Sequence, residues 1–330
     1  MTQTRNNNTV LVTGANSGVG FEAAAQLAES GWGTVILACR TVEKAEAARA
    51  ALRDRVGKDV FATVAIDTSE AKAAQAAADE LIARGTIIDG LVLNAGASSS
   101  QAHYNRDGVE ITWASTLVGH HVLTMRLWEA GLLGAHARII IAGSEGARGT
   151  LPGMTLHDVG GLARAEYGGD AAAAIVALAK TEAQDGFVNM HDYVTAKLVV
   201  AWWAAALGRR LPRGMTVNAV SPGSAPGTNF ARGAGFGMKV MVVFMKVLGP
   251  VMGMAGSLDA AARRYVDALA FDDDENGQFY ATAHPKKLVG PMGRQDGFEH
   301  FADASLQEAA FEAVVRLTDV SAPSSRIAAQ

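Results

Sequence analysis

Near its N-terminus the chain contains the stretch Thr9-Val10-Leu11-Val12-Thr13-Gly14-Ala15-Asn16-Ser17-Gly18-Val19-Gly20, which decides the fold. Its short β-branched run predicts a buried strand, and the glycines predict a turn that opens a helix near Gly18–Ser30. Gly14 permits the tight turn, Gly18 lets the backbone approach a diphosphate, and Gly20 allows close packing of helix on strand. Free N–H groups and the helix dipole at the helix start favour phosphate. The stretch therefore predicts a dinucleotide site.

Short apolar runs and long Ala-rich stretches alternate along the rest of the chain. Because fully apolar strands between helices are typical of a parallel sheet covered on both faces, we predict an α/β, doubly wound parallel sheet, the Rossmann fold. Further strands are expected at Thr34–Ala38, Val60–Ile66, Ile87–Leu93, Ile139–Ala142 and Thr216–Val220. Helices are expected near Glu43–Val56, Ser69–Arg84, Asp107–Leu133, Tyr193–Arg210 and Gln307–Leu317.

Three segments interrupt this pattern within what we expect to be a single domain, residues 1–330. Residues 146–190 form an extended insertion with a helical stretch near Ala171–Thr181, and residues 321–330 form a polar, flexible tail. Residues 224–256 are rich in Gly and Met and include an amphipathic helical pattern at Gly237–Met254. That pattern predicts a core-packing helix, an adaptable helical lid over a lipophilic substrate, or a segment in transient contact with a membrane. It is not an uninterrupted membrane span.

Composition excludes several classes of protein. The 330 residues carry a net charge of −4 with a pI near 6.1 and no basic block, so nucleic-acid binding is not expected. The single cysteine, Cys39, cannot form an internal disulfide, which indicates a reducing compartment. The polar start of the chain lacks the apolar region of a secretory signal, so a cytoplasmic location is expected. The histidines show no zinc-ligand spacing, and no metal is predicted. No oligomeric state follows from the sequence.

The ends of the predicted strands carry residues suited to a dinucleotide. Arg40 ends the second strand, where an acidic residue would bind the ribose of NAD and a guanidinium instead pairs with a 2′-phosphate. This favours NADP(H), with Asn16 and Ser17 as nearby polar groups. Asp67 is either the N-cap of the next helix or an adenine contact. Asn94-Ala95-Gly96 ends the fourth strand, where the ligand crevice of such a sheet lies.

A catalytic group is predicted from Tyr193 and Lys197, which lie four residues apart at the start of a helical run. This spacing places phenol and ammonium on one helix face, where the cation should lower the pKa of Tyr193 towards neutrality. Tyr193 is then suited to exchange a proton with a reacting carbonyl oxygen. Ser144 follows the strand Ile139–Ala142 and can donate a hydrogen bond to the same oxygen.

Together these motifs resemble the short-chain dehydrogenase/reductase family. The matching residues are Thr13–Gly20 (with Val19), Arg40, Asp67, Asn94-Ala95-Gly96, Ser144, Tyr193, Lys197 and Ser221-Pro222-Gly223. The resemblance implies that Tyr193 is the catalytic acid/base, that Ser144 positions the substrate oxygen, and that Lys197 binds the nicotinamide ribose. It also implies that Pro222, Gly223 and Thr228 flank the nicotinamide.

Within that family, the pattern is most similar to the branch of retinol dehydrogenases and light-dependent protochlorophyllide reductases. The evidence is Val35–Arg40, Leu117–His120, the long segment between Ser144 and Tyr193, and the C-terminal stretches Gly277–Tyr280 and Phe298-Glu299. The expected function is NADP(H)-dependent hydride transfer to or from a carbonyl or alcohol carbon. The expected substrate is a small molecule with a bulky, lipophilic structure.

Two departures from the family pattern keep alternatives open. The usual catalytic asparagine is Thr116, so either Thr116 or a neighbour such as Ser115 occupies the proton-relay position, or the chain is a dinucleotide-binding sensor without turnover. The reductase branch's active-site cysteines are replaced by Val200 and Ser224, which leaves reduction of a C=C bond as a second alternative.

Overall fold

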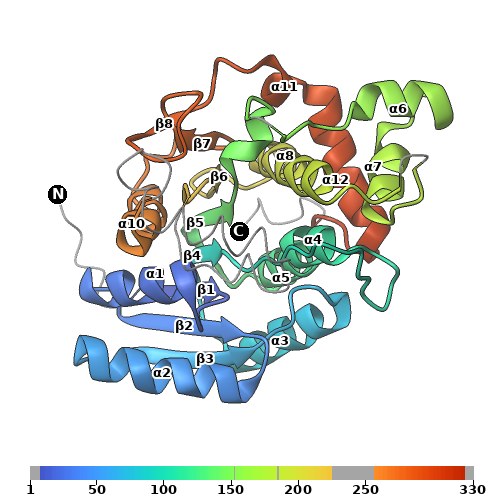
Figure 1. Ribbon diagram of the computed structural model, residues 1–330. Helices are drawn as coiled ribbons and strands as arrows, with labels where there is room; N and C mark the ends of the chain where they lie inside the picture. The colour runs from blue at the N-terminus through green and yellow to red at the C-terminus, as the bar shows by residue number, and fades with distance from the viewer. Residues whose placement is uncertain (1–7, 152, 184–185, 225–255, 324–330) are drawn as a thin grey trace.

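The computed structural model describes residues 8–151, 153–183, 186–224 and 256–323 (Figure 1). Within them the chain forms one sheet of eight strands in the order β3-β2-β1-β4-β5-β6-β7-β8. All neighbouring strands are parallel except β7 and β8. The strands are β1 (Thr9–Thr13), β2 (Thr34–Cys39), β3 (Phe61–Ala65), β4 (Ile88–Leu93), β5 (Leu133–Ala142), β6 (Thr216–Val220), β7 (Phe279–Thr282) and β8 (Met292–Arg294). The predicted doubly wound parallel sheet is confirmed, with an antiparallel edge strand added.

Helices cover both faces of the sheet and enclose two separate apolar cores. The first core lies against α1 (Gly18–Glu29), α2 (Val42–Val56) and α10 (Leu258–Ala268). The second lies against α3 (Ala71–Arg84), α5 (Gly119–Glu129), α6 (Val159–Glu166), α7 (Ala171–Ala179), α8 (Asn189–Gly208) and α12 (Ala304–Thr318). In Figure 1 α10 lies at the left of the strands and α8, α12 and α7 at the right. Short elements complete the list: α4 (Ile111–Trp113), a π-helical turn (Ala114–Val118), a 3₁₀ turn (Glu145–Arg148) and α11 (Glu299–Ala302).

The strand residues explain why the sheet is buried on both sides. In β1 all five residues are buried; Val10 and Val12 face the first core and Leu11 faces the second. Because successive side chains of a strand point to opposite faces, an uninterrupted apolar run is stable only between two helical layers. β1 lies where the strand order reverses, and ligands of doubly wound sheets bind at such a position.

Several predicted boundaries are wrong. The helical region expected over Asp107–Leu133 begins at Ile111 and ends at Glu129, because β5 starts at Leu133 and extends well before Ile139. The helix α10 was not predicted. Ser257 caps its N-terminus by accepting a hydrogen bond from the Ala260 N–H at 3.0 Å, a signal that is present in the sequence. No helix in the described ranges has both the length and the apolar character that a membrane crossing requires.

Gly119 lets α5 approach the loop after β3. Its N–H donates to the Thr68 carbonyl at 2.9 Å, and a Cβ at position 119 would lie 2.4 Å from that same oxygen. The contact is to backbone, so no side chain can move aside to relieve it. The helix and the loop therefore require glycine here.

We expect Gly119→Ala to lower the free energy of unfolding by about 1–3 kcal/mol, the usual scale of overpacking in a tight interior. Urea unfolding followed by circular dichroism measures this change. Gly297→Ala is the matched control, because no atom lies within 4 Å of a Cβ built at that position. If the two variants were equally stable, the loop after β3 would be able to move and accommodate the added methyl group.

Candidate functional site

The glycine loop after β1 adopts a conformation that glycine favours at two positions. Gly14 and Gly18 have φ angles of +68° and +59°, in the left-handed region. The Gly14 N–H donates to the Ala38 carbonyl at 2.8 Å, which ties the loop to the end of β2. At Gly20 a Cβ would lie 2.5 Å from the Gly14 carbonyl oxygen, so the start of α1 packs directly on the turn. These features form a narrow, backbone-lined cradle that fits a diphosphate at a helix start.

Thr13 connects this loop to the end of β4. Its carbonyl accepts from Asn94 Nδ2 and its hydroxyl oxygen accepts from the Ala95 N–H, both at 2.9 Å. The same hydroxyl lies 2.9 Å from His120 Nε2 on α5. His120 Nδ1 lies 2.9 Å from the Thr116 carbonyl, which can only accept, so Nδ1 carries the proton and Thr13 donates to Nε2. The three elements around the crevice are thereby joined.

The predicted adenosine end of the site lies at β2 and β3. Arg40 Nε is 3.5 Å from Asp67 Oδ2, and the Arg40 side chain is 58% exposed, so its guanidinium is accessible to a phosphate. Asp67 is not a helix N-cap, because α3 begins at Ala71 and Glu70 precedes it. Its Oδ1 instead accepts from the Ser69 N–H at 3.0 Å and hydroxyl at 2.6 Å. The adenine contact stays a prediction.

Ser144, Tyr193 and Lys197 come together at the carboxyl end of β5. Lys197 Nζ donates to the Ala142 carbonyl at 2.8 Å, and the Tyr193 hydroxyl is hydrogen-bonded to the Ser144 side chain. Ser144 also accepts from the Gly146 N–H at 3.2 Å, which fixes the start of the 3₁₀ turn. The Tyr193 phenol and the Ser144 hydroxyl therefore lie next to each other, and the buried Lys197 ammonium lies one helical turn from Tyr193.

The electrostatics of this group differ from expectation for Tyr193. Burial raises the pKa of the phenol, partly offset by the Ser144 hydrogen bond and reinforced by the nearby Glu145 carboxylate. The predicted lowering by Lys197 is wrong, because the dominant effect on the phenol is its removal from water, which disfavours the charged form. Burial also lowers the pKa of Lys197, to about 8. Near neutral pH the phenol is protonated and the lysine is mostly charged.

Thr116 lies in the π-helical turn beside this group. It is buried, and within the described part of the chain its hydroxyl has no hydrogen-bond partner. A Cβ added to Gly96 would lie 3.6 Å from Thr116 Oγ1 and 4.0 Å from Lys197 Nζ, so both groups face the end of β4. The Ser115 hydroxyl accepts from the Ala97 N–H at 2.9 Å. Of the two candidates, Ser115 therefore already has a backbone partner, and which of them serves a proton relay stays a prediction.

The turn after β6 completes the crevice. Gly223 has a φ of +78°, and a Cβ there would lie 2.9 Å from the Leu288 carbonyl oxygen. Thr228 and nearly all of the predicted lid, residues 225–255, lie outside the described residues. Among the residues that are described, no three His, Cys, Asp or Glu side chains gather as a metal site would require.

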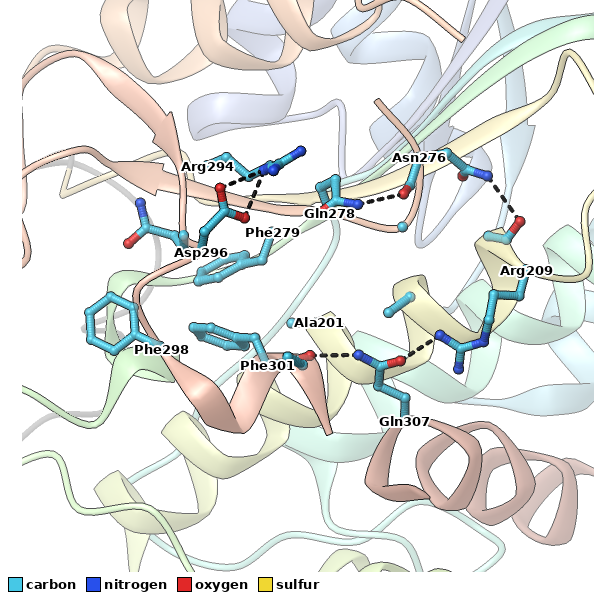
Figure 2. Close-up of a pocket in the computed structure, with 15 residues that line it drawn as sticks. Ala201, Arg209, Asn276, Gln278, Phe279, Arg294, Asp296, Phe298, Phe301 and Gln307 are labelled. Carbon is cyan, nitrogen blue, oxygen red and sulfur yellow. Dashed lines mark hydrogen bonds and ion pairs between the residues drawn. The ribbon is translucent and has the colours of Figure 1, made fainter. Parts of the chain in front are cut away.

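A separate hollow of about 420 Å³ lies between α8, the β7–β8 hairpin, α11 and α12 (Figure 2). Its polar lining is bonded internally: Gln307 accepts from Arg209 and donates to the Phe301 carbonyl, and Asn276 donates to the Gly208 carbonyl. Phe279 separates it from the site, because a Cβ on Gly143 would lie 2.7 Å from the phenyl ring. Ser144, Tyr193 and Lys197 do not line it.

Sequence reasoning assigned no role to several residues of the site. Thr13 and His120 were quoted only within motifs, yet they carry the connection between the loops, and Glu145 and Arg264 form a buried ion pair next to Ser144. Thr13 stands at the end of a recognisable strand, which was a usable signal. Arg264 lies on α10, so its position could not be inferred without that helix.

Comparisons with known proteins agree with this geometry. A family model described as short chain dehydrogenase matches residues 8–157. The WW domain-containing oxidoreductase of Pongo abelii is 32% identical over 224 residues, which cover 68% of this chain and 50% of that protein. Human retinol dehydrogenase 13 is 31% identical over 218 residues, covering 66% of this chain and 59% of that one. The chain thus spans about half the length of the first of these relatives.

A solved structure extends the agreement in fold. A short chain dehydrogenase from Burkholderia cenocepacia J2315, in complex with NADP, superposes with a TM-score of 0.57. It is 23% identical, and the match covers 84% of this chain and 96% of that one. The arrangement of the sheet and its helices is therefore one that a dehydrogenase uses.

Two buried histidines predict a strong acid sensitivity. Burial lowers the pKa of His120 to about 3 and that of His121 to about 4. Both rings are therefore neutral in the folded chain, whereas in the unfolded chain they titrate near 6.5. The unfolded state binds more protons between pH 6.5 and the folded values, so stability is full above pH 6.5 and is lost as the pH falls.

We expect each histidine to remove about 1 kcal/mol of unfolding free energy between pH 7 and pH 5.5. Urea titrations at both pH values, on the parent chain, His120→Gln and His121→Gln, measure each contribution. His136→Gln, at an exposed position, is the control and should leave the pH dependence unchanged. An unaltered pH dependence in both buried variants would refute neutral burial.

Proposed function

The chain belongs to the short-chain dehydrogenase family, and from this we propose that it is an NADP(H)-dependent oxidoreductase. It would move hydride between the nicotinamide and a carbonyl or alcohol carbon of a bulky, lipophilic substrate. The observation that carries the proposal is the meeting of Ser144, Tyr193 and Lys197 at the end of β5. The name of the relative retinol dehydrogenase 13 supports a lipophilic substrate.

The residues of the crevice fit such a cofactor. The backbone cradle of Gly14 and Gly20 suits the diphosphate, and the accessible Arg40 guanidinium suits a 2′-phosphate. The NADP complex of the structurally similar dehydrogenase is consistent with this preference. Asn94 at the end of β4 and Lys197 beside the end of β5 are the residues that we expect to contact the ribose and nicotinamide end.

The chain's own groups then perform the proton chemistry. NADPH, when bound, supplies the hydride. Tyr193 Oη, whose pKa is raised by burial and which is therefore protonated near neutral pH like an ordinary phenol, would donate its proton to the carbonyl oxygen as negative charge develops there. Ser144 donates a hydrogen bond to the same oxygen, and the Lys197 ammonium stabilises the phenolate that remains. In the opposite direction the phenolate would accept the alcohol proton.

Cofactor preference tests the role of Arg40. Arg40→Asp should weaken NADPH binding by roughly tenfold to a hundredfold, since a charge-assisted contact to phosphate is worth about 1.5–3 kcal/mol. Steady-state kcat/KM with NADPH and NADH, and fluorescence titration of each, measure the change. Arg49→Asp, on α2, is the matched control, because Arg49 pairs only with the neighbouring Glu46 among the ion pairs of the described chain. Equal efficiency of the parent chain with the two cofactors would contradict the assignment.

The chemistry is tested by Tyr193→Phe. The variant should bind NADPH as before and turn over two to four orders of magnitude more slowly, the usual contribution of a general acid. NADPH oxidation against a panel of lipophilic aldehydes and ketones, all-trans-retinal among them, measures the rate. Tyr104→Phe, at an exposed tyrosine, is the control. Tight NADPH binding by the parent chain without turnover on any of these compounds would instead favour the sensor.

A further inference from the structure

A buried ion pair lies directly behind the catalytic serine. Glu145 is the residue after Ser144 in the chain, whereas Arg264 lies on α10. Arg264 Nη1 is 3.1 Å from Glu145 Oε1, and the two side chains are only 10% and 5% exposed. Charges withdrawn from water to this degree are stable only with well-aligned partners.

The pair has such partners, and they come from the end of β6 and from the β7–β8 hairpin. Glu145 Oε1 accepts from the Thr282 N–H and hydroxyl at 3.2 and 3.1 Å, and its Oε2 accepts from the Ser221 hydroxyl. Arg264 donates to the Ser221 carbonyl at 2.9 Å, the Thr282 hydroxyl at 2.8 Å and the Gly290 carbonyl at 3.0 Å. The end of β6, the β7–β8 hairpin and the turn after β5 are thereby held together.

The ion pair is connected to both sides of the proposed reaction site: to Ser144 and to the turn after β6. On one side, Tyr193 is hydrogen-bonded to Ser144, whose backbone continues into Glu145. On the other, a Cβ added to Gly223 would lie 3.1 Å from Arg264 Nη1, so the guanidinium lies against the turn after β6. A displacement of the pair would move the serine and this turn relative to each other.

A second guanidinium makes the pair less necessary for holding the hairpin. Arg148 is 2% exposed and donates to the Glu145 carbonyl at 3.1 Å. It also donates to the carbonyls of Thr282, His284 and Lys287 at 3.0, 3.2 and 3.0 Å. These bonds involve backbone acceptors, so they remain when the Glu145 side chain is changed. The hairpin can therefore stay attached while the ion pair is removed.

We propose that Glu145 and Arg264 are positioning residues, which fix the distance between the catalytic Ser144 and the Pro222-Gly223 turn. The inference rests on the proposed function, because it assigns these two flanks to the substrate oxygen and the nicotinamide. Neither side chain contacts the reacting atoms in this assignment. Small displacements of reacting groups have large kinetic effects, up to about a hundredfold for roughly 1 Å.

The test compares Glu145→Gln, Arg264→Met and the double variant with Arg263→Met. Arg263 is the neighbouring residue, 59% exposed in a surface pair with Asp267, and serves as the control. Each single variant leaves a buried group without its counter-charge and should lower Tm, whereas the double variant should recover much of that loss. The readouts are Tm, kcat and KM for NADPH-dependent reduction of all-trans-retinal, and the emission of bound NADPH.

The expected result is a double variant with a Tm above that of either single variant and an NADPH Kd within about threefold of the parent's, but with kcat reduced roughly tenfold to a hundredfold. Its bound NADPH should also emit differently from the parent's, and Arg263→Met should change nothing. A double variant with parental kcat would overturn the proposal and leave the pair a stabilising feature only. If the parent chain does not reduce retinal, parental NADPH emission in the double variant overturns the proposal equally. Retained turnover in Tyr193→Phe would instead count against the proposed function.

Discussion

The arrangement of the crevice depends on the hydrogen bonds of Thr13. The end of β1 is the point where the strand order reverses, and there the threonine binds the β4 loop through its carbonyl and its hydroxyl and donates to His120 on α5. The glycine loop, the Asn94 turn and the helix that carries Thr116 therefore have one common anchor. Because the Thr13 side chain is fully buried, water cannot replace these bonds. The hydrogen bonds of Thr13 therefore help to position the more exposed residues of the site.

The protonation states of Lys197 and His120 follow from the burial of both side chains. Lys197 donates to the Ala142 carbonyl, and its ammonium also helps to keep His120 neutral. A neutral imidazole has one donor and one acceptor, which match the Thr116 carbonyl and the Thr13 hydroxyl. The histidine therefore engages the backbone oxygen of Thr116, whereas the buried Thr116 hydroxyl has no hydrogen-bond partner among the described residues. In this chain, the carbonyl at position 116 is thus already bonded within the protein.

The sequence was sufficient for the sheet and for the pairing of Tyr193 with Lys197, because both depend on local patterns, whereas Ser144 was added from its place after a strand and from the family resemblance. Apolar runs specify buried parallel strands, and the four-residue spacing of Tyr193 and Lys197 specifies one helix face. The raised pKa of Tyr193 and the Glu145–Arg264 pair could not be predicted, since they result from burial and from residues more than a hundred positions apart. Asp67 shows a subtler limit: of its two predicted roles, helix cap or adenine contact, the cap is wrong, because its carboxylate accepts from the Ser69 N–H in a turn before the helix begins.

The same burial sets the protonation states of Tyr193 and Lys197 from which the proposed reaction would start. A phenol with a raised pKa holds its proton at neutral pH, and Lys197, with a pKa of about 8, is then mostly an ammonium. A protonated phenol beside a serine hydroxyl can give a proton to a carbonyl oxygen without any prior ionisation. Oxidation of an alcohol needs the phenolate, and formation of that anion is opposed by burial and by Glu145. Without a bound ligand, the phenol is therefore present in the form that donates a proton, and the phenolate must be generated before it can accept one.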